Sequence, residues 1–392
     1  MINIIGGTYW ETCIEPDYHE LYGSGLRAAF MLSKKTDVTY YTCIGKDDID
    51  ALTFKANSLG IKTTPTIIDK TVEFEYYHPL SKPIAFNVNH DVEIMPDMIF
   101  TEPCLFYGMI EATVKIQGDY VVYDPQNHVK FSDTFSSAKH LALILNLNEA
   151  KQISGLNDDI ETIGTTLLTT ENAEVIVIKN GANGAMVFYE NNIDTIPVFE
   201  SNKVWPIGSG DVFSAIFAWS WMIKKETPKD SALLASKYVA NFCNSGNHQI
   251  EKLKEFEPLT GQIKTKNIYL ASPFFSMAER FLVNQFRNSL IDFGNEVYSP
   301  FHDSGIVDID NEEDVNKITS LNLDHIQNAD VIVAILNGND PGTIFEIGYA
   351  RALNKKTIIF CENFKENDLF MLKGSGCEIT SDLTTTVYKA SW

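Results

Sequence analysis

The sequence is poor in basic residues and its cysteines are not clustered. It has 31 lysines and arginines against 52 aspartates and glutamates, giving a formal net charge of -21. This excess repels phosphate polymers and anionic lipid, so we expect no nucleic-acid or membrane partner. The six cysteines lie far apart, with no Cys-x-x-Cys pair. This spacing argues against a structural zinc and predicts a reducing, cytoplasmic location.

Long apolar runs are also missing. The longest, around residues 213–223, is too short to span a bilayer. The first residues, 1–5, have no basic flank or cleavage site and predict a buried strand, not a signal peptide. At 392 residues and 44% hydrophobic content, the chain is long enough for two domains with their own cores.

The stretch 205–213 joins a glycine turn, a carboxylate and the start of an apolar helix. Gly208 and Gly210 can adopt backbone angles that other residues avoid, so the amides around Ser209 can converge on an anion at the helix N-terminus. A carboxylate at Asp211 does not suit an anion ligand. It suits a general base that takes the proton of a hydroxyl attacking a γ-phosphate, which predicts a kinase. A plain helix start with an acidic first residue is the alternative.

This stretch resembles the Asp-Thr-x-Gly-Ala-Gly-Asp signature of the PfkB family of ribokinase-like sugar and nucleoside kinases. Trp205 and Pro206 stand in place of the Asp-Thr pair, so the acid that helps the family hold a monovalent cation is replaced. The resemblance covers residues 1–250. It implies a ribokinase-like α/β domain that uses ATP and Mg²⁺.

Two further motifs in this region resemble the same family. Asn146 and Glu149 match its Asn-x-x-Glu motif, which implies that Glu149 organises Mg²⁺ through water. A helix cap has the same pattern. Lys179 and Gly181 follow a β-branched strand and open a turn that resembles the family's Thr-x-Gly-x-x-Gly-Ala turn near the nucleotide; a hairpin is the alternative.

The substrate side of this region resembles the family less closely. Gly23 and Gly25 stand where the family places a Gly-Gly-x-x-x-Asn turn against substrate hydroxyls, but the asparagine is missing. The glycines could equally mark only a helix start. Segments 72–77 and 83–88 are separated by prolines and predict a small β lid, or else a surface hairpin.

A charged segment, 251–266, is broken by a proline and a glycine and predicts a linker. Beyond it, apolar segments at 267–271, 331–336 and 357–361 alternate with helical patterns such as 276–293. This alternation predicts a second α/β domain, over 267–392, with a compact parallel sheet.

The acidic residues of this second domain suggest a site. Pro341 and Gly342 set a tight turn after a strand, and we expect Asp330, Asp340 and Glu346 to converge at the edge of the sheet. Such carboxylates repel one another, so one should have a raised pKa and act as an acid while another stays ionised and acts as a nucleophile. A helix cap with solvated charges is the alternative.

Residues 268–275, 298–303, 329–330 and 340–350 resemble the nucleoside 2-deoxyribosyltransferase family and its deoxynucleotide N-hydrolase relatives. The resemblance implies a flavodoxin-like, doubly wound domain. It implies that Glu346 attacks C1′ of a deoxyribose, as in a retaining glycosidase, and that an acid at Asp330 or Asp340 handles the proton of the base. Tyr269 would hold the nucleophile, or serve only as a core tyrosine.

The same resemblance suggests substrate contacts and an assembly. It places Asp303 and Gly342 at the substrate, and Lys373 and Ser375 where the hydrolase branch receives a 5′-phosphate; the last two could equally form a surface turn. It also implies a homo-oligomer through the second domain. Transfer to a second base and hydrolysis by water both remain open.

These patterns predict a cytoplasmic, bifunctional enzyme that acts on small nucleosides, nucleotides or sugars. Two alternatives follow from the altered motifs. The first domain could be a nucleotide sensor that gates a glycosidase, as in a defence system. The second domain could instead cleave the ribosyl bond of a dinucleotide such as NAD.

Overall fold

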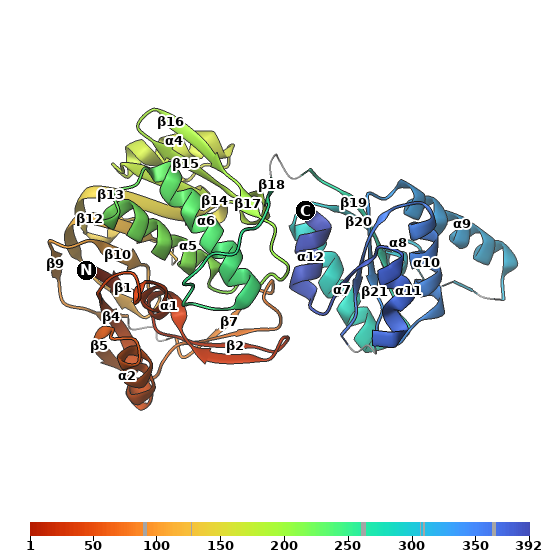
Figure 1. Cartoon of the computed structure of the whole chain (residues 1–392), viewed down its shortest axis with the longest axis horizontal. Helices are drawn as coiled ribbons and strands as arrows, with labels where there is room; N and C mark the ends of the chain where they lie inside the picture. Colours follow the sequence, from red (N-terminus) through yellow and green to blue (C-terminus); the bar gives the residue numbers. More distant parts are fainter. Residues whose placement is uncertain (89–91, 127, 260–263, 306, 309, 363–365) are drawn as a thin grey trace. The chain divides into compact units, whose positions relative to one another are not determined.

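A computed structural model describes residues 1–88, 92–126, 128–259, 264–305, 307–308, 310–362 and 366–392 (Figure 1). The chain divides into two compact units, Met1–Gly261 and Gln262–Trp392. The division falls inside the segment predicted as a linker. Part of that segment belongs to the first unit, because β18 (Pro258–Leu259) pairs antiparallel with β17 (Val198–Phe199).

The first unit is built on a large sheet with the strand order β16-β15-β14-β13-β12-β10-β1-β4-β5, and β9 beside β12. Strands from β5 to β14 run parallel, whereas β15 and β16 are antiparallel. The carboxyl ends of the parallel strands therefore line one edge. The strands are β1 (Ile2–Ile5), β4 (Val38–Gly45), β5 (Lys62–Ile68), β9 (Met98–Phe100), β10 (Cys104–Tyr107), β12 (Ile116–Asp124), β13 (Ser137–Asn146), β14 (Val175–Lys179), β15 (Ala185–Tyr189) and β16 (Asn192–Ile196).

Helices cover both faces of this sheet. Helix α5 contacts β10 and β12 and packs on α1 and α6, while α3 and α4 contact β13 and β14. The helices are α1 (Gly23–Leu32), α2 (Ile49–Asn57), α3 (Leu147–Ser154), α4 (Ile160–Thr170), α5 (Ser209–Ala218), which continues into a π-helical turn (Trp219–Ile223), and α6 (Pro228–Ser245); short 3-10 turns lie at Lys46–Asp48, Ser132–Thr134 and Gly181–Asn183.

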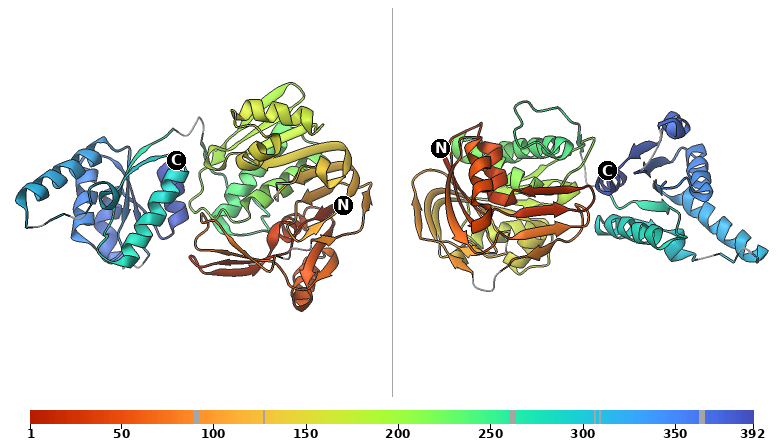
Figure 2. Two further views of the ribbon diagram at one scale, coloured as in Figure 1. Left: turned by 180° about the vertical axis from the view of Figure 1, so that it is seen from behind. Right: turned by 90° about the horizontal axis from the view of Figure 1, so that it is seen from below.

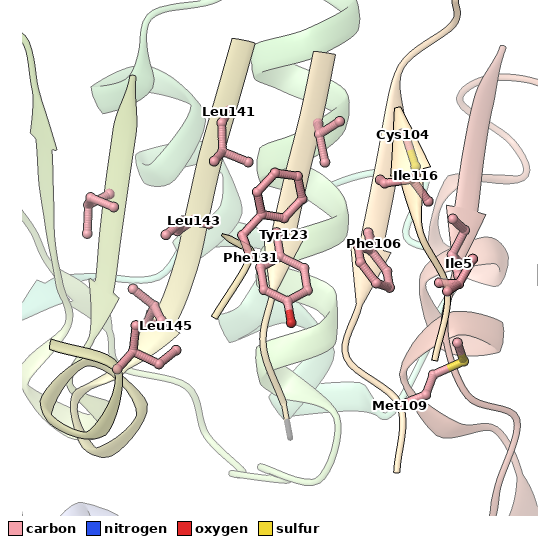
Figure 3. Packing of buried hydrophobic residues seen from close by; sticks show 14 of the residues in the cluster. Ile5, Cys104, Phe106, Met109, Ile116, Tyr123, Phe131, Leu141, Leu143 and Leu145 are labelled. Atoms are coloured by element: carbon pink, nitrogen blue, oxygen red, sulfur yellow. The ribbon is translucent and has the colours of Figure 1, made fainter. Parts of the chain in front are cut away.

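Alternate residues along a strand point to opposite faces of the sheet and so pack against different helices. Leu141, Leu143 and Leu145 of β13 join one core cluster with residues of α3 and α4 (Figure 3). The intervening residues, Ala142 and Ile144, are equally buried and point to the other face, as the period of a strand requires. Strands buried on both faces read as continuous apolar runs, which is why the sequence predicts them.

A smaller sheet has the order β3-β2-β6-β7. The two segments predicted as a lid pair here as β6 (Glu73–Tyr76) and β7 (Ile84–Phe86). The other two strands, β2 (Trp10–Cys13) and β3 (Tyr18–Leu21), were not predicted, because polar residues interrupt their apolar pattern. A short parallel pair, β8 (Glu93–Ile94) and β11 (Ala112–Thr113), lies elsewhere in the unit.

The second unit has a parallel sheet with the order β20-β19-β21-β22-β23. Numbered from its own first strand, this is the 2-1-3-4-5 order of flavodoxin-like folds, and it confirms the predicted class. The chain reverses its direction of winding between β19 and β21, where such folds have their crevice. The strands are β19 (Asn267–Ala271), β20 (Glu296–Tyr298), β21 (Val331–Ile335), β22 (Lys356–Phe360) and β23 (Glu378–Thr380).

Helices flank this sheet on both faces (Figure 2). Helices α7 and α12 pack together, whereas α9 and α10 form the other layer. Within the described part of the chain, no helix is both long and apolar enough to cross a bilayer. The helices are α7 (Met277–Asp292), α8 (Pro300–Asp303), α9 (Glu312–Asn328), α10 (Pro341–Ala352), α11 (Phe370–Gly374) and α12 (Leu383–Ser391), with a 3-10 turn at Glu366–Leu369.

We predict that Ile178→Ala destabilises the first unit by about 2–5 kcal/mol, because it opens a cavity in a core where Ile178 is fully buried. The matched control is Ile99→Ala, at a position that is 78% exposed, which should change the free energy of unfolding by no more than about 0.5 kcal/mol. Urea denaturation followed by circular dichroism measures both. Equal effects would contradict the assigned core.

Candidate functional sites

The N-terminus of α5 forms the centre of the first site. Gly208 precedes the helix with a φ of 77°, in the left-handed region, so the turn requires glycine there. The amide of Ser209 donates to the Pro206 carbonyl at 2.9 Å. The next amides begin the helix, where the positive end of its dipole favours an anion.

Asp211 lies in the first turn of α5, is buried, and is held by two side chains. Nη1 of Arg27 donates to its Oδ2 at 2.8 Å, and Nε2 of Gln126 donates to its Oδ1 at 2.6 Å. Arg27 also donates to both carboxylate oxygens of Glu11. Burial alone would lower the pKa of Arg27, but Glu11 and Asp211 raise it well above its ordinary value, so the guanidinium keeps its charge.

Lys179, at the end of β14, lies beside the same turn. A side chain at Gly210 would come within 3.3 Å of its Nζ. Nζ donates to Oδ2 of Asp124 at 3.1 Å, and that oxygen also accepts from Oγ of Ser214 at 2.6 Å. Burial lowers the pKa of Lys179, but Asp124 and Glu149 outweigh it and raise the pKa above its usual value. A fixed ammonium group therefore faces the predicted anion site.

Asn146 and Glu149 form the helix cap that the sequence left as an alternative. The Asn146 side chain accepts from the Glu149 amide at 2.8 Å, and Oε2 of Glu149 accepts from the Asn146 amide at 2.7 Å. Burial, followed by the charge of Asp124, raises the pKa of Glu149 to about 7. The cap thus places the buried carboxyl group of Glu149 close enough to Asp124 for their negative charges to repel each other.

These acids suit a hard divalent cation. No group of three or more potential metal ligands converges in the residues described by the structure. However, Asp124 and Asp211 both raise the pKa of Glu149, and a nearby cation would relieve this repulsion. The oxygen donors are those that Mg²⁺ prefers, and Glu149 could bind it through water, as predicted.

The predicted glycines have local structural roles. The Gly23 amide donates to Oε1 of Glu11 at 3.1 Å, and a Cβ at Gly25 would clash with Tyr40 and with the backbone of Gly6. Gly181 adopts a φ of 53° in the β14–β15 hairpin, so the hairpin alternative describes this turn.

A cavity of about 240 Å³ adjoins these groups. Its lining combines aromatic rings from the smaller sheet and from the residue before it with the acidic and basic residues already described. They are Tyr9, Glu11, Gly23, Ser24, Arg27, Phe74, Tyr76, Gly108, Ile110, Gln126, Ile207, Gly208, Gly210 and Asp211.

The second site lies in the second unit, where β19 meets α10, the helix that follows β21. Tyr269, on β19, donates its hydroxyl to Oε1 of Glu346 on α10 at 2.5 Å. The pKa of Glu346 is raised to about 7. Burial is the main cause, the hydrogen bond from Tyr269 partly offsets it, and the charge of Asp340 raises the pKa further. Tyr269 stacks on Tyr298, which fixes its ring.

Asp340 belongs to this site, whereas Asp330 does not. Asp340 caps α10: its Oδ2 accepts from the amide of Thr343 at 2.7 Å and from the Thr343 hydroxyl at 2.9 Å. Asp330 precedes β21, so it stands at the amino end of the sheet, where Oδ2 accepts from the Asn267 amide at 2.8 Å. The expected convergence of three carboxylates is therefore wrong; Glu346 and Asp340 remain.

The other predicted substrate residues lie on loops and short helices. Oδ2 of Asp303 accepts from the Ser299 amide at 2.8 Å. Gly342 lies against Asp340, whose Oδ2 would be 3.1 Å from a Cβ there. Lys373 and Ser375 are exposed, and the Ser375 carbonyl accepts from Nη2 of Arg351 at 2.7 Å.

Sequence reasoning missed the residues that hold Asp211. Arg27 carried one available signal: it is a lone charge between Leu26 and Ala28 in an apolar helix, so burial with an acidic partner could have been expected. Glu11 and Gln126 gave no such signal, because their segments are polar and far apart in the chain.

Comparisons with known proteins show that two regions of the chain each match a family of enzymes. Residues 107–250 match the model of the pfkB family carbohydrate kinases, and residues 268–382 match that of nucleoside 2-deoxyribosyltransferase. The pfkB match lies within the first unit, and the nucleoside 2-deoxyribosyltransferase match lies within the second. No curated protein sequence matches it.

Solved structures that resemble the chain include three kinases. Ribokinase from Thermotoga maritima is 16% identical, with 64% of this chain and 94% of that chain covered and a TM-score of 0.48. A nucleoside kinase from Methanocaldococcus jannaschii is 14% identical, covers 64% and 93%, and has a TM-score of 0.46. The Burkholderia thailandensis nucleoside kinase in complex with ADP-inosine is 12% identical, covers 64% and 91%, and has a TM-score of 0.46.

We predict that Tyr269→Phe raises the pKa of Glu346 further above about 7. The hydrogen bond that this substitution removes stabilises the charged carboxylate, so without it the protonated form is favoured. The carboxylate would then form at higher pH than in the wild type. Carbon-13 NMR of labelled glutamate measures the midpoint. Tyr298→Phe is the control, since its hydroxyl bonds Ser304 and Asn322. An unchanged midpoint in Tyr269→Phe would contradict the assigned contact.

Proposed function

We propose that the second unit cleaves the N-glycosidic bond of a (deoxy)nucleoside or nucleotide, with Glu346 as the nucleophile. The observation that carries this proposal is the contact between the half-buried Glu346 and the Tyr269 hydroxyl, next to the strands between which a flavodoxin-like sheet reverses its winding. The match to nucleoside 2-deoxyribosyltransferase supports the substrate class.

The reaction would proceed in two displacements. An oxygen of the Glu346 carboxylate bonds to C1′ as the bond from C1′ to the base nitrogen breaks. The base leaves with the bonding electrons and takes up a solvent proton relayed by the Asp340 carboxylate. Tyr269 keeps the attacking oxygen oriented. The resulting ester is released by water, or by a second base, and Glu346 is regenerated.

For the first unit we propose binding of ATP with Mg²⁺ and phosphorylation of a sugar or nucleoside hydroxyl. The phosphates would lie at the N-terminus of α5 and beside Lys179, and Asp211 would take the proton of the acceptor hydroxyl. Mg²⁺, organised by Glu149, would neutralise phosphate charge. The match to the pfkB family supports this assignment.

A second candidate is favoured by one observation. Arg27 and Gln126 hold both carboxylate oxygens of Asp211. The first unit could therefore bind nucleotide without turnover and act as a sensor for the glycosidase. ATP binding without ADP formation in the presence of any acceptor would favour this reading. Whether the first unit is a kinase or a sensor, we propose that the chain acts on small molecules. We also propose that it forms a homo-oligomer through the second unit.

We predict that Glu346→Gln lowers the release of free base by about 10³-fold or more, because the amide cannot form the ester. The measurement is chromatography of a panel of nucleosides and 5′-nucleotides after incubation with the full chain. Glu378→Gln is the matched control, because its side chain pairs with Lys389 on a partly exposed surface. Base release at the wild-type rate from Glu346→Gln would exclude this nucleophile.

We predict that Asp211→Asn lowers phosphoryl transfer from ATP by about 10²- to 10⁴-fold, the usual loss when a general base is removed. ADP formation is followed with Mg²⁺ and a panel of sugars and nucleosides. Asp119→Asn, which breaks only an exposed pair with Lys139, is the control. If Asp211→Asn kept the wild-type rate, another residue would have to be the base.

A further inference from the structure

The first unit contains a buried cluster of charges at its proposed acceptor site. Arg27 is 1% exposed at its side chain, and its two partners, Glu11 and Asp211, are 7% and 10% exposed. Nη1 of Arg27 bridges the two acids, at 3.0 Å from Oε1 of Glu11 and 2.8 Å from Oδ2 of Asp211. A guanidinium that pairs with two buried carboxylates is held strongly, since loss of either contact leaves a buried charge uncompensated.

The glycine turn is shaped to receive this guanidinium. A Cβ on Gly208 would lie 2.1 Å from Nε and 2.2 Å from Cζ of Arg27, far inside contact distance. The backbone of the proposed phosphate turn therefore lies directly on Arg27. This places the arginine between the turn and the acidic side chains, and all of these residues line the same cavity.

Both carboxylate oxygens of Asp211, the proposed base, already accept hydrogen bonds. Oδ2 of Asp211 accepts from Arg27 and Oδ1 accepts from Gln126 at 2.6 Å, so each oxygen already has a fixed donor. The backbone carbonyl of Asp211 accepts from the Tyr107 hydroxyl at 2.8 Å, which holds the residue in place. A charge-assisted hydrogen bond from Arg27 stabilises the carboxylate and so weakens it as a proton acceptor.

We propose that Arg27 is a positioning residue that locks the first unit, by holding Asp211 away from proton abstraction, so that ATP binds but phosphoryl transfer is slow. This inference rests on the proposed role of Asp211 as the base. The site carries its own inhibitor, and an acceptor is phosphorylated only when its hydroxyl displaces Arg27 or Gln126 from the acid.

Releasing the lock requires two substitutions. Arg27→Asn alone would leave Glu11 and Asp211 as uncompensated buried charges, so it is combined with Glu11→Gln, which removes one of them. Arg27→Lys is the second variant, because it keeps the charge but loses the planar fork that bridges the acids. Arg287→Asn removes an arginine from the other unit and serves as the matched control.

The test uses the full chain with ATP, Mg²⁺ and a panel of ribose, deoxyribose and nucleosides. ADP formation gives kcat and KM, calorimetry gives ATP affinity, and thermal unfolding reports the fold. We expect Arg27→Asn/Glu11→Gln to raise kcat at least about tenfold, as part of the contribution a general base makes. The KM for ATP should change little. Adding Asp211→Asn should abolish the gain, and Arg27→Lys should fall between wild type and the double variant.

The outcomes separate this inference from the proposed function. If the folded double variant binds ATP and shows an unchanged or lower kcat, Arg27 is no lock, whether or not the wild type is a kinase. If neither protein binds ATP, the proposed nucleotide site fails and the lock with it. If kcat rises with Asp211→Asn still present, the gain does not act through Asp211 and the lock is overturned. A gain that requires Asp211 supports it.

Discussion

A carboxylate that is wholly or partly buried needs a hydrogen-bond partner, and the charge of that partner determines how readily the carboxylate takes up a proton. In the second unit Glu346 has a neutral partner, the Tyr269 hydroxyl, and its pKa lies at about 7 because burial outweighs that bond. Near neutral pH the group is therefore divided between its acid and charged forms. In the first unit Asp211 has a cationic partner, Arg27, which holds the carboxylate firmly. The carboxyl group of Glu346 can thus gain or lose a proton near neutral pH, whereas that of Asp211 is held by a cation.

The fold places these acids before any chemistry is chosen. In both units parallel strands bring polar residues to the carboxyl edge of a sheet. Asp124 and Lys179 end their strands in the first unit. In the second unit, Asp340 caps the helix that carries Glu346. Both sites are thus assembled from strand ends and helix starts that local sequence determines.

Local sequence therefore predicts much of the molecule. Continuous apolar strands, alternating helices and a glycine turn before α5 give the two α/β units and the position of the first site. The smaller sheet was predicted only in part: β6 and β7 were expected, but β2 and β3 are polar enough to read as loop. The bridge from Arg27 to Asp211 joins residues far apart in the chain, and no local pattern specifies such a contact.

The error over Asp330 has a simple physical origin. Strand β21 separates it from Asp340, and a residue before a strand cannot share an edge with a residue after it. The sequence already held this information, because the strand predicted over 331–336 begins directly after Asp330. The register of β19 against β21, which pairs Ile268 with Val331, agrees with it.

The close fit of Gly208 to Arg27 has a consequence for how this chain can change. A larger residue at 208 would clash with the guanidinium and would also be strained at a φ of 77°, so it could enter only after Arg27 had been replaced and the turn had changed. Loss of Arg27, in turn, leaves two acids that need one further substitution. Any evolutionary route out of the present arrangement is therefore ordered, with the arginine and its acidic neighbours changing before the glycine does.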